Sequence, residues 1–595
     1  KAALKTMDYA HIDIDSIFLE ADDLLVVGDS IMARIDFLSA YESSGFIIKS
    51  MESDVNVSKH GILFDGLMIE TNNSNLHLDL HMLYNDYTAF NDFLDSVRFD
   101  SKIYPTDIML SDIGHFADVM YQMPNRVFFE CLYTGPVSDF KIDNLSFEYG
   151  KETHFEGSMS MCGLPDFMTC YNTLNIDNMA YSYDDLVHFH IPGESVVIPL
   201  PKQLEPLQSG NIQGRFKGSY TDFISELFVT SKIGDVGAAI EMKKVGPDNL
   251  FSSQIEAKRI NIGSLTNAPE KIGTIDLSAQ VSGRNTAQGM ELDIDGNAYN
   301  AFVLGNTIDA ISLDGNLSGQ RFNGLVSIKD NELDLDFNGM LDFSDSHKPV
   351  MNFDAEITKA DLKELNIVKG QSKSILSTKI NANLNGIDLD VAEGSLSISN
   401  TKYSDGNGSY AMDHFDATLV NDQFMQKRFT IGSDLLDFDM AGKINFATLG
   451  NAFKSYVVSY ADIPQWHSDG YGKIDDFSMM PSDDQDFFVN LTLKKPTVIT
   501  SLLMPNLNIA NNTSFKGTFT SKTRQLNFTL RSKSATYNGI RFDNIECKNF
   551  STPFSSVARL SVDDVILRDS AGHSDMFKLQ NLGLTARLRN DSIVA

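Results

Sequence analysis

Apolar and polar residues alternate one by one over long stretches of this chain. In residues 76–82 four apolar side chains fall on one face of an extended strand, and three polar side chains fall on the other. The same alternation runs through residues 333–343 and resumes in 351–357. Short turn clusters, such as Asp330-Asn331, separate these runs. Period-two alternation between turns is typical of antiparallel sheets with one apolar and one solvated face, so we predict an all-β fold.

Glycines interrupt the apolar face in a recurring pattern, apolar-x-Gly-x-apolar. A glycine inside a strand weakens it and usually marks a bend, a bulge or a close approach of two backbones. The spacing fits two interpretations equally well: creases where long strands fold over, or ordinary bulges in a closed sandwich. The predicted crease glycines are Gly157, Gly218, Gly315, Gly339, Gly442 and Gly517.

Helical spacing is sparse. Apolar residues three or four apart predict short helices near 87–97, near 111–121 and over 449–457, and one helical turn at 360–365. We interpret these helices as caps or plugs on a β scaffold. The prolines of residues 192–210, Pro192, Pro199, Pro201 and Pro206, form the clearest internal boundary. We therefore expect three continuous segments: 1–200 with the first two helical insertions, 201–445, and 446–595.

The chain of 595 residues carries 48 basic and 80 acidic residues, a net charge of −32. Such a charge repels phosphate, which argues against nucleic acid as a partner and against most of this surface lying on an anionic membrane. No apolar run approaches the roughly 18 residues of a membrane helix. The chain opens on Lys1 and stops inside a strand-like pattern, so we expect it to be an internal piece of a longer protein.

Motifs for chemistry are absent from the sequence. There is no glycine-rich phosphate loop, no HExxH and no CxxC, so we expect no catalytic residue, no cofactor and no metal. His188 and His190 would share one strand face without a third ligand, and Asp334 with Asp336 is better explained as the solvated face of a strand. Of the four cysteines, only Cys162 and Cys170 would pair across one loop, and whether they do stays open.

Burial of apolar material is therefore the expected role of this sheet. One strand per roughly 14 residues gives about 40 strands, far more than one open twisted sheet usually holds. Several sandwiches, one very large barrel or one continuous sheet folded lengthwise into a trough would each accommodate them. An apolar trough would hold acyl chains, since a C16 chain buries about 13 kcal/mol of methylene surface at ~0.8 kcal/mol per CH₂.

Several segments of the sequence resemble a known family. They are Leu200–Leu207 running into Gly210–Gly218, Asn316–Gly324, Asp336–Ser344, Phe353–Leu362 and Tyr537–Asn544. Together they resemble the TamB family, the translocation and assembly module subunits of the AsmA-like group, in its Bacteroidota form. The resemblance covers most of the chain as an internal segment and rests on strand-and-turn phrasing.

The resemblance implies a β-taco: an elongated antiparallel sheet folded lengthwise into an apolar groove, with a few short helices. It also implies a periplasmic protein of a Gram-negative envelope, anchored in the inner membrane through a region outside this piece. A TamA-type barrel protein of the outer membrane would be its partner. The implied role is moving phospholipid across the periplasm, and an older view of the family assigns it to assembling outer-membrane β-barrels.

Our leading hypothesis is accordingly a passive, non-enzymatic lipid conduit, in which phospholipid acyl chains lie in the groove between the two membranes. The alternative is a scaffold or chaperone for outer-membrane barrel assembly, in which open sheet edges pair with client strands. Nucleic acid is not expected as a partner under either hypothesis. The predicted lining residues of the groove are Leu76, Leu78, Leu80, Met82, Leu292, Ile294, Leu313, Leu333, Leu335, Phe337, Leu341, Met351, Phe353 and Ile357.

Overall fold

A computed structural model describes most of the chain. The described residues are 13–43, 45–116, 120, 123–166, 169–190, 197, 200, 202–286, 289–369, 373–406, 408–421, 426–458, 484–504, 506–568, 575–589 and 592–594. The chain divides into two compact units, unit 1 (Lys1–Ile311) and unit 2 (Ser312–Ala595), which we describe separately. The predicted segment boundary at 192–210 lies partly outside the described residues, including Pro192, Pro199 and Pro201, and the three-segment division stays a prediction.

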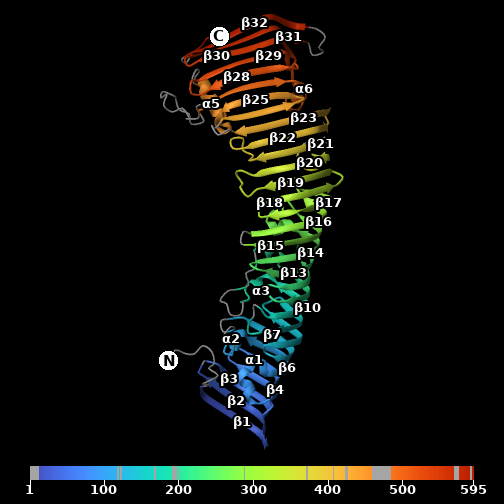
Figure 1. The fold of residues 1–595 in the computed structure, drawn as a ribbon, viewed down its shortest axis with the longest axis vertical. Helices are drawn as coiled ribbons and strands as arrows, with labels where there is room; N and C mark the ends of the chain where they lie inside the picture. Colours follow the sequence, from blue (N-terminus) through green and yellow to red (C-terminus); the bar gives the residue numbers. More distant parts are fainter. Residues whose placement is uncertain are drawn as a thin grey trace. The chain divides into compact units, whose positions relative to one another are not determined.

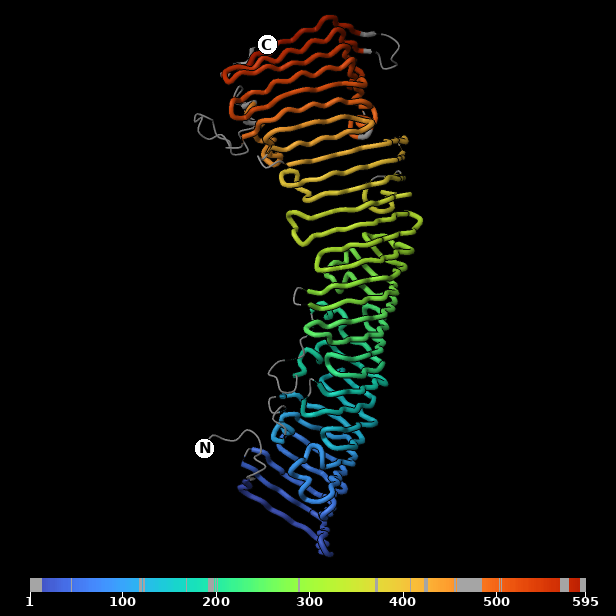
Figure 2. The backbone as a smooth tube through the Cα atoms, in the orientation of Figure 1, coloured from blue at the N-terminus to red at the C-terminus, as the bar shows by residue number. Residues whose placement is uncertain are grey.

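The all-β prediction is confirmed, with 70% strand and 9% helix. The described residues form 33 strands of one antiparallel sheet, fewer than the roughly 40 expected, because many strands run to 12–15 residues. Figure 1 shows the strands of each unit following one another in chain order, and Figure 2 shows the short connections between them. Among the described pairings none joins the first strands to the last, so the sheet is open.

In unit 1 the strands are β1 (Ile14–Val27), β2 (Ser30–Glu42), β3 (Ile47–Ser58), β4 (Gly61–Thr71), β5 (Asn75–Leu83), β6 (Arg98–Met109), β7 (Arg126–Pro136), β8 (Asp139–Tyr149), β9 (Thr153–Cys162), β10 (Tyr171–Ser182), β11 (Ser209–Gly218), β12 (Phe223–Ser231), β13 (Gly234–Val245), β14 (Asp248–Asn261), β15 (Thr274–Thr286) and β16 (Gly289–Val303). The boundary between the units falls within β17 (Asn306–Ser318).

In unit 2 the strands are β18 (Arg321–Lys329), β19 (Leu333–Asp342), β20 (Val350–Asp361), β21 (Ile375–Asn385), β22 (Glu393–Asp405), β23 (Gly408–Asn421), β24 (Lys427–Ser433), β25 (Leu436–Lys443), β26 (Asp486–Leu493), β27 (Leu507–Ile509), β28 (Thr513–Thr520), β29 (Gln525–Tyr537), β30 (Ile540–Thr552), β31 (Ser555–Arg568), β32 (Asp575–Arg589) and β33 (Ser592–Val594). Strand order follows the chain except that β26 pairs with β28, and β27 pairs with the far end of β29.

The helices whose bounds the structure gives among the described residues are short. They are η1 (Tyr87–Asp92), α1 (Phe93–Ser96), α2 (Leu110–Ile113), α3 (Tyr183–Val187), η3 (Lys202–Leu207), α4 (Ile262–Thr266), α5 (Phe446–Val458) and α6 (Pro496–Leu503). Helices therefore lie at three of the predicted places, although residues 117–119 and 121 of the second prediction lie outside the described residues. The predicted turn at 360–365 is supported by a 2.9 Å hydrogen bond from the Leu365 N–H to the Asp361 carbonyl.

Bulged strands bend the sheet at asparagines. Five asparagines inside strands have left-handed backbones, with φ between 49° and 54°. They are Asn144, Asn300, Asn400, Asn544 and Asn581. The strand register shifts beside Asn144, so that Ile142 lies opposite Met159 and Leu145 lies opposite Gly157. Ile142 and Leu145 therefore face the same side of the sheet although they are three residues apart. Asparagine tolerates this backbone better than branched residues, and bulges bend a strand and increase its twist.

Candidate functional site

The two faces of the sheet differ sharply in chemistry, as β19 illustrates. Asp336 and Asn338 are exposed on one face, whereas Leu335 and Phe337 are half-buried on the other. We call the side of the sheet that carries these leucines and phenylalanines the inner face, and the opposite side the outer face. Alternation alone produces this division, because successive side chains of a strand point to opposite faces.

Strand register brings the predicted lining residues of unit 2 together. Leu335 lies opposite Ile357, Leu341 lies opposite Met351, and Phe337 lies opposite Ala355. The ring centroids of Phe337 and Phe353 are 5.2 Å apart, and those of Phe322 and Phe337 are 6.4 Å apart, so a ladder of rings crosses β18, β19 and β20. The inner face continues over β21 and β22, where Ile380 lies opposite Ile398.

The predicted lining residues of unit 1 form two further groups. On β5, Leu78, Leu80 and Met82 lie opposite apolar residues of β4, and Leu76 also packs against a small buried cluster around Val127 and α2. On β16, Ile294 lies opposite Val281 of β15, and Leu292 lies opposite Gly283. Leu313 is half-buried on β17. Cys131 on β7 is only 5% exposed, and this burial raises the pKa of its thiol to about 11.

The inner face is incompletely covered by protein. All fourteen predicted lining residues are half-buried: none is fully buried and none is fully exposed. The chain has an accessible surface of 34948 Å² at a mass of 66.0 kDa. A compact protein of this mass would expose about 21,000 Å², and two separate globules of half the mass would expose about 25,000 Å². Together with the half-buried lining residues, this large area agrees with an inner face that lacks a continuous protein layer among the described residues.

In part of unit 2, helix α5 does cover the inner face. Its residues Phe446, Leu449, Ala452, Phe453 and Tyr456 pack on β25, β26 and β28, where Met440, Phe487 and Phe519 are only 5%, 6% and 1% exposed. The Tyr456 hydroxyl lies 3.0 Å from the Ser556 hydroxyl and accepts a hydrogen bond from Asn549 Nδ2 at 3.3 Å. Here α5 acts as the predicted plug.

Asp390 holds the first turn of α5 from the β21–β22 connection. Its carboxylate accepts hydrogen bonds from the Phe446 and Ala447 N–H groups at 2.8 and 2.9 Å and pairs with Lys427 Nζ at 2.5 Å. Burial alone would raise the pKa of Asp390, but these three donors outweigh it and hold the pKa below its usual range. A carboxylate at a helix N-terminus also interacts favourably with the helix dipole.

At the crease glycines two neighbouring backbones approach closely. A Cβ on Gly339, where φ is +153°, would lie 2.3 Å from the Asn352 carbonyl oxygen, and one on Gly157 would lie 2.1 Å from that of Asn175. Gly315 and Gly517 also lie inside strands, whereas Gly218 ends β11 and Gly442 is the penultimate residue of β25. Close approach explains why these positions take glycine. Their role as folds of a groove stays a prediction.

The paired aspartates, the two histidines and the cysteines that the sequence singled out have structural explanations. Asp334 and Asp336 both pair with Lys329 on the outer face, at 2.6 and 3.0 Å. The prediction that His188 and His190 share a strand face is wrong, because the chain turns into α3 and His188 caps the end of that helix. Cys162 and Cys170 are not joined by a disulfide, and neither Cys131 nor Cys547 forms one.

Neither a metal cluster nor a membrane-spanning helix emerges from the described part of the chain. No group of three or more histidine, cysteine or acidic side chains there is placed to hold a metal ion. No helix there is long and apolar enough to cross a bilayer. In comparisons with known proteins, the chain matches no family model, no curated protein and no solved structure.

Proposed function

We propose that this protein is a periplasmic, bridge-like lipid transport protein. The acyl chains of phospholipids would lie along the inner face of its sheet on their way between the inner and outer membranes. The observation that carries the proposal is the half-buried inner face over β18–β22, where large apolar side chains form a continuous surface that no helix of the described residues covers. Apolar surface that extends over several strands and is only half-buried commonly marks a binding site in soluble proteins.

Acyl chains suit such a surface energetically. Each methylene group removed from water contributes about 0.8 kcal/mol, without any need for directional contacts. On β19 the inner face offers Leu333, Leu335, Phe337 and Leu341, whereas the carboxylates of Asp334 and Asp336 lie on the outer face and keep it hydrated. Lipid would supply the missing layer that an ordinary sandwich obtains from a second sheet.

In this proposal the protein binds and guides lipid and catalyses no reaction. Its anchor in the inner membrane and its TamA-type partner in the outer membrane belong to the same proposal, as does a sheet folded lengthwise into a groove. All three rest on the resemblance of the sequence phrases, which the open antiparallel sheet accommodates.

Native mass spectrometry of the purified chain tests the proposal. We expect phospholipid to copurify and to add its mass to the folded protein. The double variant Leu335→Asp with Phe337→Asp should lose most of that lipid, whereas the outer-face control Asp334→Asn with Asp336→Asn should keep it. A folded parent chain free of lipid, even after incubation with phospholipid vesicles, would contradict a lipid-carrying function.

The second candidate, a scaffold for outer-membrane barrel assembly, has one observation in its favour. The edge strand β1 is exposed along its whole length and carries large apolar side chains, such as Ile17, Leu24 and Val26 at 61%, 70% and 63% exposure. Among the described strands it pairs with β2 alone. A long apolar edge is suited to pairing with a client strand. Crosslinking of β1, but not of Phe337, to an unfolded barrel protein would favour this candidate.

A further inference from the structure

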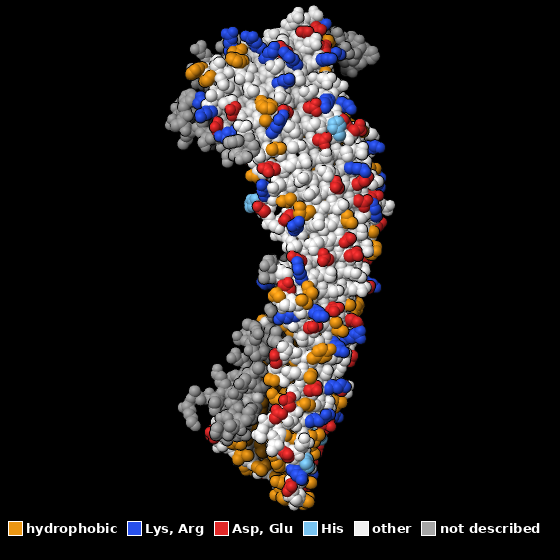
Figure 3. Space-filling view, in the orientation of Figure 1, with side chains coloured by type: hydrophobic (Ala, Val, Ile, Leu, Met, Phe, Trp, Pro, Cys, Tyr) orange, Lys and Arg blue, Asp and Glu red, His pale blue; other side chains and the backbone are white. Residues whose placement is uncertain are grey.

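The charge of the chain reverses near its C-terminal end. Residues 491–595 contain 14 basic and 7 acidic residues, a net charge of +7, whereas residues 1–490 carry a net charge of −39. Figure 3 shows basic side chains gathered over the strands from β28 onward, at the top of the view. The net charge of −32 therefore conceals one basic region in an otherwise strongly acidic protein.

Strand register places the basic residues of this region on one face. Lys516 of β28, Lys548 of β30 and Arg559 of β31 share one cross-strand row, with Thr529 and Thr585 in the same row. Arg531 lies on the next row and Arg587 on the row at the other side. We call Lys516, Arg531, Lys548, Arg559 and Arg587 the basic face.

The positive charge of the basic face is only partly neutralised. Glu546 pairs with both Arg531, at 2.8 Å, and Lys548, at 2.6 Å. These two hydrogen-bonded cations, Lys548 foremost, lower the pKa of Glu546, so it is ionised at neutral pH. Lys516, Arg559 and Arg587 are exposed and form no ion pair with any carboxylate among the described residues.

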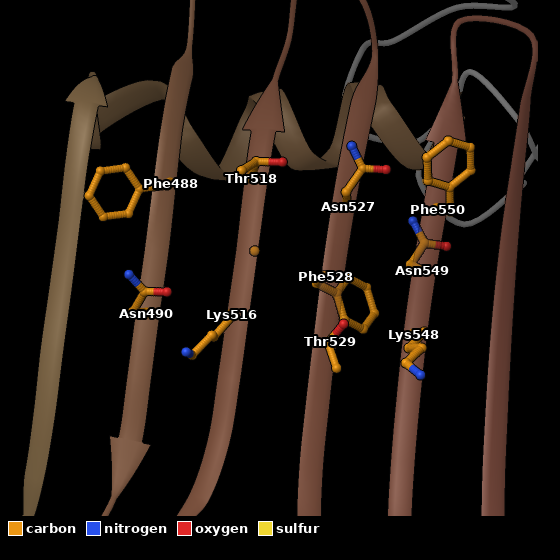
Figure 4. Close-up of a pocket in the computed structure, with 11 residues that line it drawn as sticks. Phe488, Asn490, Lys516, Thr518, Asn527, Phe528, Thr529, Lys548, Asn549 and Phe550 are labelled. Carbon is orange, nitrogen blue, oxygen red and sulfur yellow. The ribbon is translucent and has the colours of Figure 1, made fainter.

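Exposed aromatic side chains accompany these cations. Phe550 is 64% exposed, Phe488 is 37% exposed, and Phe554 in the following turn is 77% exposed. A hollow of about 540 Å³ on this face is lined by Lys516, Lys548, Phe488, Phe550, Asn490, Thr518, Asn527 and Thr529. Figure 4 shows Phe488 and Phe550 on the two outermost labelled strands, with Lys516 on a strand between them and Lys548 on the same strand as Phe550. The neighbouring residues Phe487, Phe519 and Asn549 point to the opposite side, toward α5. The basic face is thus on the outer side of the sheet, and α5 covers the inner side behind it.

We propose that the basic face docks onto a bilayer surface containing anionic phospholipids. Its cations are spread over five strands in two dimensions, which fits a plane of lipid phosphates better than a single small ligand or one linear polymer. Phenylalanines among them gain by entering the interfacial region of a bilayer. Residues 1–490 carry a net charge of −39, which would repel the same membrane. Docking is therefore confined to the last strands of unit 2.

This inference deepens the proposed function by naming a surface that would bring the sheet against a lipid source or acceptor. The purpose of membrane docking rests on the proposed lipid transport. The evidence for docking is independent of it, because that evidence is the charge and the exposure of residues on the outer face. The test therefore measures vesicle binding without any lipid transfer, and a failure of one proposal can be distinguished from a failure of the other.

The experiment is cosedimentation of the purified chain with two kinds of vesicle, pure phosphatidylcholine and phosphatidylcholine with one quarter phosphatidylglycerol. We expect binding to the anionic vesicles alone, and loss of that binding between about 0.1 M and about 0.5 M NaCl as screening increases. The variant Lys516→Glu, Arg559→Glu, Arg587→Glu should bind about 100-fold more weakly. Phe550→Ser should weaken binding by about fivefold.

A matched control carries the same change in net charge on exposed lysines of unit 1: Lys217→Glu, Lys243→Glu, Lys244→Glu. It should bind within about threefold of the parent chain, because these lysines lie far from the basic face in sequence and register. Equal losses in both triple variants would overturn the proposal in favour of a general charge effect. Binding to soluble heparin or nucleic acid but not to anionic vesicles would overturn it in favour of a polymer ligand. Circular dichroism confirms that each variant is folded.

Discussion

Two stretches of unit 2 carry the same strand pattern but bury it differently. Phe337 on β19 and Phe519 on β28 both belong to the inner face, yet Phe337 is half-buried and Phe519 is 1% exposed. The difference is α5, whose apolar side lies against β25, β26 and β28 and has no counterpart among the described residues over β18–β20. Alternation decides which way a side chain points, and a separate element decides whether that face is closed.

Truncating Phe519 should have the largest effect on stability. Phe519→Ala removes a ring packed against Phe453 and Phe487, with centroids at 4.6 and 5.6 Å, and leaves a cavity under α5. We expect a loss of about 3–5 kcal/mol in the free energy of unfolding of unit 2, measured by urea denaturation. Phe337→Ala is the matched change on the open face and should cost less than half as much. Equal losses at the two positions would remove the contrast between them.

The double variant Leu335→Asp with Phe337→Asp should be tolerated by the fold. In a packed interior two carboxylates would cost several kcal/mol each, but on an uncovered face they stay hydrated. We expect a melting temperature within a few degrees of the parent chain, by differential scanning calorimetry, together with reduced bound phospholipid. Global unfolding of this variant would mean that protein packs over the inner face at β19.

The anchor of α5 should respond to pH. Since the pKa of Asp390 is lowered in the folded state, its contribution to stability is present above the unfolded pKa of about 4 and is lost as pH falls through the folded value. Asp390→Asn should cost about 1 kcal/mol at neutral pH and should flatten the decline of stability below about pH 4. A parallel pH profile for parent and variant, followed by urea denaturation at each pH, would refute this role.

The smallest effect is expected on the outer face of β19. Asp334→Asn with Asp336→Asn removes two exposed ion pairs to Lys329, and such pairs contribute little because water screens them. The melting temperature should shift by less than about 2 °C, and bound lipid should not change. Loss of lipid from this variant would show that the outer face, rather than the inner one, carries the ligand.

Much of this comparison is predictable from the sequence, since alternation gives both the all-β fold and the face of each strand residue. The spacing over 449–457 also predicts the plug helix. Short-range patterns could not give the rest. α3 and α4 span five residues each, too few for a helical period to stand out. The bulge asparagines share one sequence feature, an apolar residue two positions before Asn144, Asn400 and Asn544. This feature predicts a bulge only if a left-handed backbone is already expected at the asparagine.

The basic face shows a different limit. Its residues lie on five strands between positions 516 and 587, and only the register reveals that they share one side. The net charge of −32 argues against contact with an anionic membrane when it is treated as spread evenly over the chain. Regional charge combined with strand register gives the opposite expectation for the last strands of unit 2.

Site-specific photocrosslinking tests the central claim most directly. A benzoylphenylalanine would replace, one at a time, Phe337 on the open inner face, Asn338 on the outer face of the same strand, and Phe519 beneath α5. After irradiation in cells or with phospholipid vesicles, mass spectrometry of the purified protein would detect attached phospholipid. We predict strong attachment at position 337 and little at positions 338 and 519. Absence of lipid at 337, or equal attachment at 337 and 338, would contradict a lipid path along the inner face.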